Sequence, residues 1–110
     1  MTFRLLFYNE AVEDELDAWP VGLRARFRAL TLRMEEYGPN LGMPHTRALG
    51  NGLFEIRAKA EEGIGRAFFC TMVGRKIVIL HSFIKKTDKT PKWELDIALT
   101  RQKEVMNHEL

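Results

Sequence analysis

The most constraining feature of the sequence is a run of three strand-like segments in its second half. Residues 53–59 alternate strictly between apolar and charged side chains, the two-residue period of a strand with one buried face. Residues 64–73 and 76–84 are rich in β-branched and aromatic residues, and Gly74-Arg75 between them fits a two-residue hairpin turn. The three segments therefore predict an antiparallel meander, with its first hairpin centred on Glu61-Glu62.

Helical patterns lie on both sides of this meander. Residues 2–8 read as a further strand, after which Asn9 can cap a short helix. Residues 20–37 predict a longer helix, and residues 92–107 predict a C-terminal helix after a proline. The apolar stripe of the longer helix consists of Leu23, Phe27, Leu30, Met34 and Tyr37. The order β-α-α-β-β-β-α predicts a single α+β domain over residues 1–110, with an N-terminal helical hairpin, an antiparallel sheet and a C-terminal helix.

Composition excludes several classes of protein. The chain has 110 residues, of which 45% are hydrophobic and 29% charged, as in one soluble globular domain. The single cysteine, Cys70, excludes an intramolecular disulfide or a cysteine-rich zinc site, and the histidines lack metal-ligand spacing. No apolar stretch approaches the roughly 18 residues of a membrane span. The N-terminus lacks the apolar core of a signal peptide, so we expect a cytoplasmic protein without a metal or other cofactor.

Charge is unevenly distributed along the chain. The net charge of +2 divides into −2 for residues 1–62 and +4 for residues 63–110. The main basic cluster consists of Lys85, Lys86, Lys89 and Lys92. Such a cluster either attracts phosphate backbones or is simply a solvated surface, and charge alone leaves both interpretations open.

The predicted hairpins place particular residues opposite one another, because paired residues in an antiparallel hairpin have a constant sum of residue numbers. Arg57 is expected to face Arg66, which in turn faces Phe83. The neighbouring row on the same face, which Lys85 continues, consists of Glu55, Phe68 and His81. We expect this face to be open and the opposite face to be buried against the helices. The residues expected on the buried face are Phe54, Ile56, Phe69, Val78 and Leu80.

Two arginines directly opposite each other are destabilising unless an anion lies between them. Glu55 is one candidate for that anion, and a bound phosphate is the other, since guanidinium groups match phosphate oxygens. His81 is either a partly buried structural histidine or a catalytic group. Phe83 is either a packing residue or a platform on which an RNA base stacks.

Three motifs carry a resemblance to a known family. They are GLFEIR at residues 52–57, GRAFF at residues 65–69 and HSFIKKTDKTP at residues 81–91, and the last is the most specific. Together with Ala98 and Arg101 in the trailing helix, they make the chain resemble the RelE/ParE superfamily of toxins, especially its HigB-like, phage-derived branch. The resemblance covers nearly the whole chain.

The resemblance implies a toxin of a type II toxin–antitoxin system. Such a toxin holds RNA against a concave basic face, enters the ribosomal A site and cleaves mRNA during translation. The implied chemistry is metal-independent: the ribose 2′-hydroxyl attacks the adjacent phosphate and leaves a 2′,3′-cyclic phosphate and a 5′-hydroxyl. The implied partners are the ribosome, mRNA and a cognate antitoxin, usually one with a helix-turn-helix domain.

The resemblance also suggests roles for individual residues. Arg57 and Arg66 would stabilise the charge of the transition state. Lys85 or Lys86 would hold the phosphate or protonate the leaving oxygen. Glu55 or His81 would act as the general base, with His81 better matched to neutral pH. The expected RNA-binding residues are Lys59, Phe83, Lys89 and Lys92.

One departure from the family keeps two alternatives open. Some members of the superfamily use a C-terminal tyrosine, but no tyrosine follows Tyr37 in this chain, and His108 lies at the end of the predicted last helix. The first alternative is a ParE-like poison of DNA gyrase without nuclease activity. The second is a non-catalytic module that binds an antitoxin or a nucleic acid.

Overall fold

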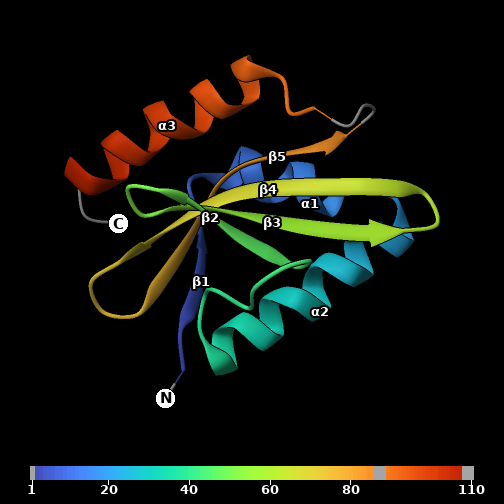
Figure 1. Cartoon of the computed structure of the whole chain (residues 1–110), viewed down its shortest axis with the longest axis horizontal. Helices are drawn as coiled ribbons and strands as arrows, with labels where there is room; N and C mark the ends of the chain where they lie inside the picture. Colours follow the sequence, from blue (N-terminus) through green and yellow to red (C-terminus); the bar gives the residue numbers. More distant parts are fainter. Residues whose placement is uncertain (1, 86–88, 108–110) are drawn as a thin grey trace.

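The computed structural model describes residues 2–85 and 89–107, with only the backbone of Lys85 described. Figure 1 shows how the elements of this part of the chain are arranged. They are β1 (Arg4–Phe7), α1 (Glu10–Asp17), α2 (Val21–Tyr37), β2 (Thr46–Gly50), β3 (Leu53–Ala60), β4 (Gly63–Met72), β5 (Lys76–Lys85) and α3 (Lys92–Asn107). The predicted α+β class is confirmed, and the structure adds the short strand β2. No helix of the described residues is long and apolar enough to cross a membrane.

The two N-terminal helices begin and end where local chemistry favours it. The Asn9 side chain caps α1 by accepting a hydrogen bond from the Val12 amide at 3.0 Å. Pro20 stands immediately before α2, and Gly38, with φ of 109°, ends that helix in a conformation that residues with a Cβ rarely adopt. The predicted stripe of α2 is buried except for Tyr37, whose side chain is exposed.

The three central strands pair as predicted over most of their length. Arg57 lies opposite Arg66, and Glu55 lies opposite Phe68, between β3 and β4. Between β4 and β5, Arg66 lies opposite Phe83, and Phe68 opposite His81. The predicted turn between β3 and β4 is also confirmed, since Ala60 pairs with Gly63 around it.

A β-bulge changes the register near the last hairpin. Phe68 pairs with His81 but Phe69 pairs with Ile79, so Leu80 is an extra residue in β5. The hairpin loop accordingly contains the three residues between Met72 and Lys76 rather than the two predicted. Residues of β5 before the bulge therefore lie on the opposite face from the one predicted, and the assignment of Val78 and Leu80 to the face of the helical hairpin was wrong.

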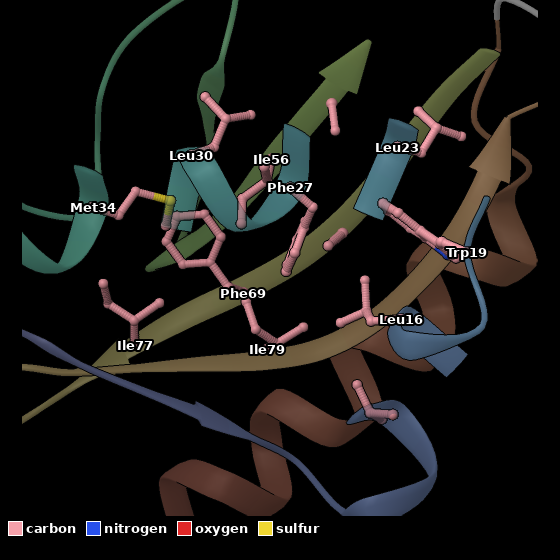
Figure 2. Close-up of a cluster of buried hydrophobic side chains, with 13 residues drawn as sticks. Leu16, Trp19, Leu23, Phe27, Leu30, Met34, Ile56, Phe69, Ile77 and Ile79 are labelled. Carbon is pink, nitrogen blue, oxygen red and sulfur yellow. The ribbon is translucent and has the colours of Figure 1, made fainter. Parts of the chain in front are cut away.

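The sheet has the order β1-β5-β4-β3-β2 and carries helices on both faces (Figure 1). On one face, α1 and α2 pack against a core that includes Phe69, Ile77 and Ile79 (Figure 2). On the other face, Ala98 and Val105 of α3 pack in a second core. The sheet residues of that second core are Leu53, Phe68, Cys70, Val78, Leu80 and Phe83. The expectation of one open face was wrong because α3 covers much of it.

The edges of the sheet are closed by two short strands. β1 pairs in parallel with β5, which places the N-terminal strand at one edge. β2 pairs with β3 at the other edge, from Thr46 opposite Ile56 to Gly50 opposite Leu53. The predicted order of elements did not include β2, because the segment around it is rich in glycine and proline and lacks the alternation that marks a half-buried strand.

Candidate functional site

The centre of the candidate site is the cross-strand pair Arg57 and Arg66. Arg66 is buried, and its guanidinium Nη1 donates to the buried carboxylate of Glu55 at 2.5 Å. Arg47 of β2 reaches the same carboxylate at 3.6 Å from a largely exposed position. Among the described residues, Arg57 has no carboxylate partner. Glu55 therefore neutralises Arg66, which was one of the two predicted solutions, and leaves the charge of Arg57 unpaired.

Both arginines also hold a buried donor that is not satisfied. In the described part of the structure, neither Arg57 Nε nor Arg66 Nε has a hydrogen-bond partner. Buried N–H groups nearly always have an acceptor, and leaving one unpaired costs about 1–3 kcal/mol. Two such donors on facing arginines favour binding of an oxyanion, and the guanidinium geometry matches the oxygens of a phosphate or a carboxylate.

Two cavities beside β3 share Pro44, His45 and Arg57 in their linings, so we treat them as the inner and outer parts of one hollow. Its inner part, of about 80 Å³, lies against Glu55, Arg57 and Arg66. The remaining residues of this inner part are Met43, Pro44, His45, Thr46 and Arg47. Its outer part, of about 450 Å³, is lined by Arg26, Pro44, His45, Arg57 and Lys59. We call the two parts together the edge hollow. Positive groups dominate its lining, so it favours an anionic ligand.

The segment before β2 holds one wall of the edge hollow in place. The Gly42 amide donates to the buried Thr46 hydroxyl at 2.8 Å, and that hydroxyl donates to Asn40 Oδ1 at 3.0 Å. Gly42 has φ of 85°, a value that favours glycine. The Arg57 amide donates to the His45 carbonyl at 2.8 Å, which joins this segment to β3 beyond the last β2 pair.

Sequence reasoning missed Arg26 and Arg47 of the edge hollow and, more important for its chemistry, His45. Its ring is partly buried and lines both parts of the edge hollow. Burial lowers the pKa of His45 below its usual 6.5, and the positive charges of Arg26 and Arg33 lower this pKa further. These effects favour the neutral form of the ring. His45 lies beside Arg57 because β2 pairs with β3. The sequence around β2 has no strand-like pattern, so this pairing could not be predicted.

Comparison with known proteins places the chain in a family. The family described as "Phage derived protein Gp49-like (DUF891)" matches residues 14–103. The chain belongs to this Gp49-like family. Its assignment to the RelE/ParE superfamily, predicted from the sequence, is thereby confirmed. No curated protein matches the sequence significantly.

The fold of this Gp49-like protein is similar to that of the E. coli toxin RelE. The solved structure is a double arginine-to-alanine mutant of RelE in the free state. The TM-score is 0.62 at 13% sequence identity, and the match covers 92% of this chain and 98% of the RelE chain. At this identity the comparison establishes a shared fold, and the site has to be argued from the residues of this chain.

Two of the predicted site residues of the Gp49-like protein lie beneath α3 rather than on an open face. His81 is 8% exposed, and its Nε2 is 2.7 Å from Glu94 Oε1 on α3. Phe83 is 7% exposed and packs against Phe68, with ring centroids 5.8 Å apart. The expectation that these two rings would face solvent was wrong, because α3 packs over this part of the sheet. Arg66 was also expected to face solvent, but it is buried beside Glu55. Their roles in base catalysis and base stacking stay predictions.

The predicted lysines are distributed over two regions. Lys59 is exposed and lines the edge hollow. Lys89 and Lys92 are exposed near the start of α3. Lys85 ends β5 opposite Ile64, and Lys86 lies outside the described residues, so the structure does not place either side chain. Within the described chain, no three His, Cys, Asp or Glu side chains form a group that could hold a metal ion.

Proposed function

We propose that this Gp49-like protein is the toxin of a toxin–antitoxin pair and acts as a metal-independent endoribonuclease that cleaves mRNA on the ribosome. The single observation that carries the proposal is the pair of buried, unsatisfied donors, Arg57 Nε and Arg66 Nε, in a hollow lined mainly by positive groups. Family membership and the RelE-like fold, whose solved relative is a toxin, support the same role.

The edge hollow suits a phosphodiester that gains charge during a reaction. Arg57 is at the junction of the inner and outer parts, where its unpaired guanidinium would bind the scissile phosphate. In the transition state, negative charge accumulates on the phosphate oxygens. Donors already fixed by the fold stabilise that charge without reorganisation, and removing one such donor typically slows a reaction by about 10²–10³-fold.

The dimensions of the hollow favour a single strand of RNA. Its outer part, of about 450 Å³, is large enough to hold one nucleotide. Lys59 and Arg26 lie where the adjoining backbone would pass. The proposed antitoxin, expected to carry a helix-turn-helix domain, would neutralise the toxin by keeping RNA from these cations.

Arg57→Ala tests the proposal with the least risk of unfolding, because Arg57 has no ion-pair partner among the described residues. Primer extension on messages after brief induction should show cuts inside translated regions with the wild type and none with Arg57→Ala. Arg4→Ala is the matched control: Arg4 is exposed on β1, at the opposite edge of the sheet, and its replacement should leave the cuts unchanged. Blocking translation initiation should abolish cleavage if it depends on the ribosome.

Other results would point to the alternatives. Intact messages with arrested growth and stalled DNA replication would favour a gyrase poison. Intact messages with normal growth would favour a non-catalytic binding module. Cuts that persist in Arg57→Ala would contradict the role proposed for the edge hollow.

A further inference from the structure

His45 lies where a proton acceptor would be needed if RNA occupies the edge hollow. Its ring lines both the inner part, where the two arginines with unsatisfied donors lie, and the outer part. Its backbone is joined to Arg57 by a hydrogen bond of 2.8 Å, so both residues keep a fixed relationship. Building on the proposed function, we propose that His45 is the general base that removes the proton from the ribose 2′-hydroxyl.

The other candidate bases are already engaged. Glu55 accepts from Arg66 at 2.5 Å and is 3% exposed, so its carboxylate is committed to a buried ion pair. His81 contacts Glu94 at 2.7 Å beneath α3. The His45 ring makes no side-chain hydrogen bond to any described residue, so its nitrogens are available to a ligand.

The charged groups around His45 come from four elements and are mostly positive. The positive groups around the hollow are Arg26 and Arg33 of α2, Arg47 of β2, Arg57 and Lys59 of β3, and Arg66 of β4. Among the described residues, Glu55 is the one carboxylate in the lining, and its partner is Arg66. A ring that is neutral at pH 7 accepts a proton, and the pKa of His45 is lowered chiefly by burial and then by Arg26 and Arg33.

The proposed step balances as a transesterification. A His45 ring nitrogen takes the 2′-hydroxyl proton, and the 2′-oxygen forms a bond to phosphorus. The bond from phosphorus to the 5′-oxygen breaks, and its electron pair stays on that oxygen, which takes a proton from water. The resulting hydroxide takes the proton back from His45. The products are a 2′,3′-cyclic phosphate and a 5′-hydroxyl, and nothing is oxidised or reduced.

His45→Gln removes the base but keeps a polar side chain of similar size. With purified ribosomes stalled on a defined mRNA, single-turnover cleavage at pH 7 should fall by about 10²–10⁴-fold, the usual contribution of a general base. Binding of a 2′-deoxy oligonucleotide, which cannot react, should stay within about twofold of the wild type. Unchanged cleavage by His45→Gln would overturn the inference and leave the proposed function standing. No cleavage by the wild type would overturn both.

The pH dependence of cleavage distinguishes a catalytic role of His45 from a structural one. Wild-type cleavage should decline as pH falls through the lowered pKa of His45, below 6.5, because the protonated ring cannot accept a proton. Arg26→Gln should move this acidic limb to higher pH by removing a nearby positive charge. Arg28→Gln, an exposed arginine of the same helix that does not line the hollow, should leave the limb in place. An acidic limb that does not move in Arg26→Gln would contradict the assignment.

Discussion

Arg57 and Arg66 face each other directly across β3 and β4, but within the described part of the chain only Arg66 meets a carboxylate. The fold therefore keeps one neutralised and one unpaired guanidinium side by side. Facing like charges weaken a sheet, whereas an oxyanion between them would relieve the repulsion and satisfy both Nε donors. Replacing Arg57 with an uncharged residue should therefore make the free protein more stable and weaken its binding of an anion.

Replacing Arg57 with Met should stabilise the free protein. The change removes the facing charge and the unsatisfied Nε while retaining an apolar side chain, and we expect about 0.5 kcal/mol of added stability. Urea unfolding of Arg57→Met beside Arg4→Met measures the difference. In parallel, inorganic phosphate should raise the Tm of the wild type but not that of Arg57→Met. A loss of more than about 1 kcal/mol in Arg57→Met would show that the arginine supports the fold.

Replacing Arg66 with Met should have the opposite effect. It leaves the Glu55 carboxylate buried without its partner at 2.5 Å, and losing one member of a buried ion pair costs about 3–5 kcal/mol. Arg47→Met removes only the exposed partner at 3.6 Å and should cost less than about 1 kcal/mol. Chemical denaturation of both variants tests the contrast. The double variant Arg66→Met/Glu55→Leu should recover much of the loss, and equal losses in the single and double variants would exclude this explanation.

Gly65→Ala should destabilise the protein through Trp19. A Cβ at Gly65 would lie 2.5 Å from the indole Cζ3, and Trp19 is itself buried between α1, α2 and the sheet. Overpacking of this kind costs about 1–3 kcal/mol. Thermal or urea unfolding should show a smaller penalty for Gly65→Ala when Trp19 is replaced by Leu. The same penalty in both backgrounds would mean that the backbone of β4, rather than the indole, resists the new methyl group.

Burial of Cys70 should make stability fall in alkaline solution. Burial raises the pKa of its thiol from 9.0 to about 11 in the folded protein, so the unfolded chain loses this proton first. The thiol's contribution to stability is intact below pH 9 and is lost as pH rises towards 11, at about 1.4 kcal/mol per pH unit. Comparing unfolding free energies of wild type and Cys70→Ala between pH 8 and pH 11 isolates this slope. Parallel curves for the two proteins would contradict it.

Most of the strand pairing could be predicted because the paired strands follow each other in the sequence and are joined by short turns. Strict alternation and a two-residue turn determine which residues of β3 and β4 face each other, and this placed Arg57 opposite Arg66. The β5 bulge could not be predicted in the same way, because both registers bury apolar side chains: Val78 and Leu80 are apolar, and so are Ile77 and Ile79.

The site was harder to predict because it is assembled from distant segments. The pairing of Arg66 with Glu55 was one of the two solutions that the sequence allowed. The packing of α3 over His81 and Phe83 was not foreseen, since an apolar helix stripe does not say which face of a sheet it covers. Arg26 and His45 reach the edge hollow only through the packing of α2 and the pairing of β2, and neither lies within a motif.

The extra residue at Leu80 restricts which changes the sequence of β5 can accept in homologous proteins. Exchanging one apolar residue for another in β5 changes packing locally, at a cost of about 1 kcal/mol for shapes of similar volume. Deleting a residue between Ile77 and Leu80 would instead shift the remaining residues of that stretch to the other face, so that each core would receive the other's side chains. We therefore expect homologous sequences to vary freely in composition along this stretch while keeping its length from the hairpin loop to His81.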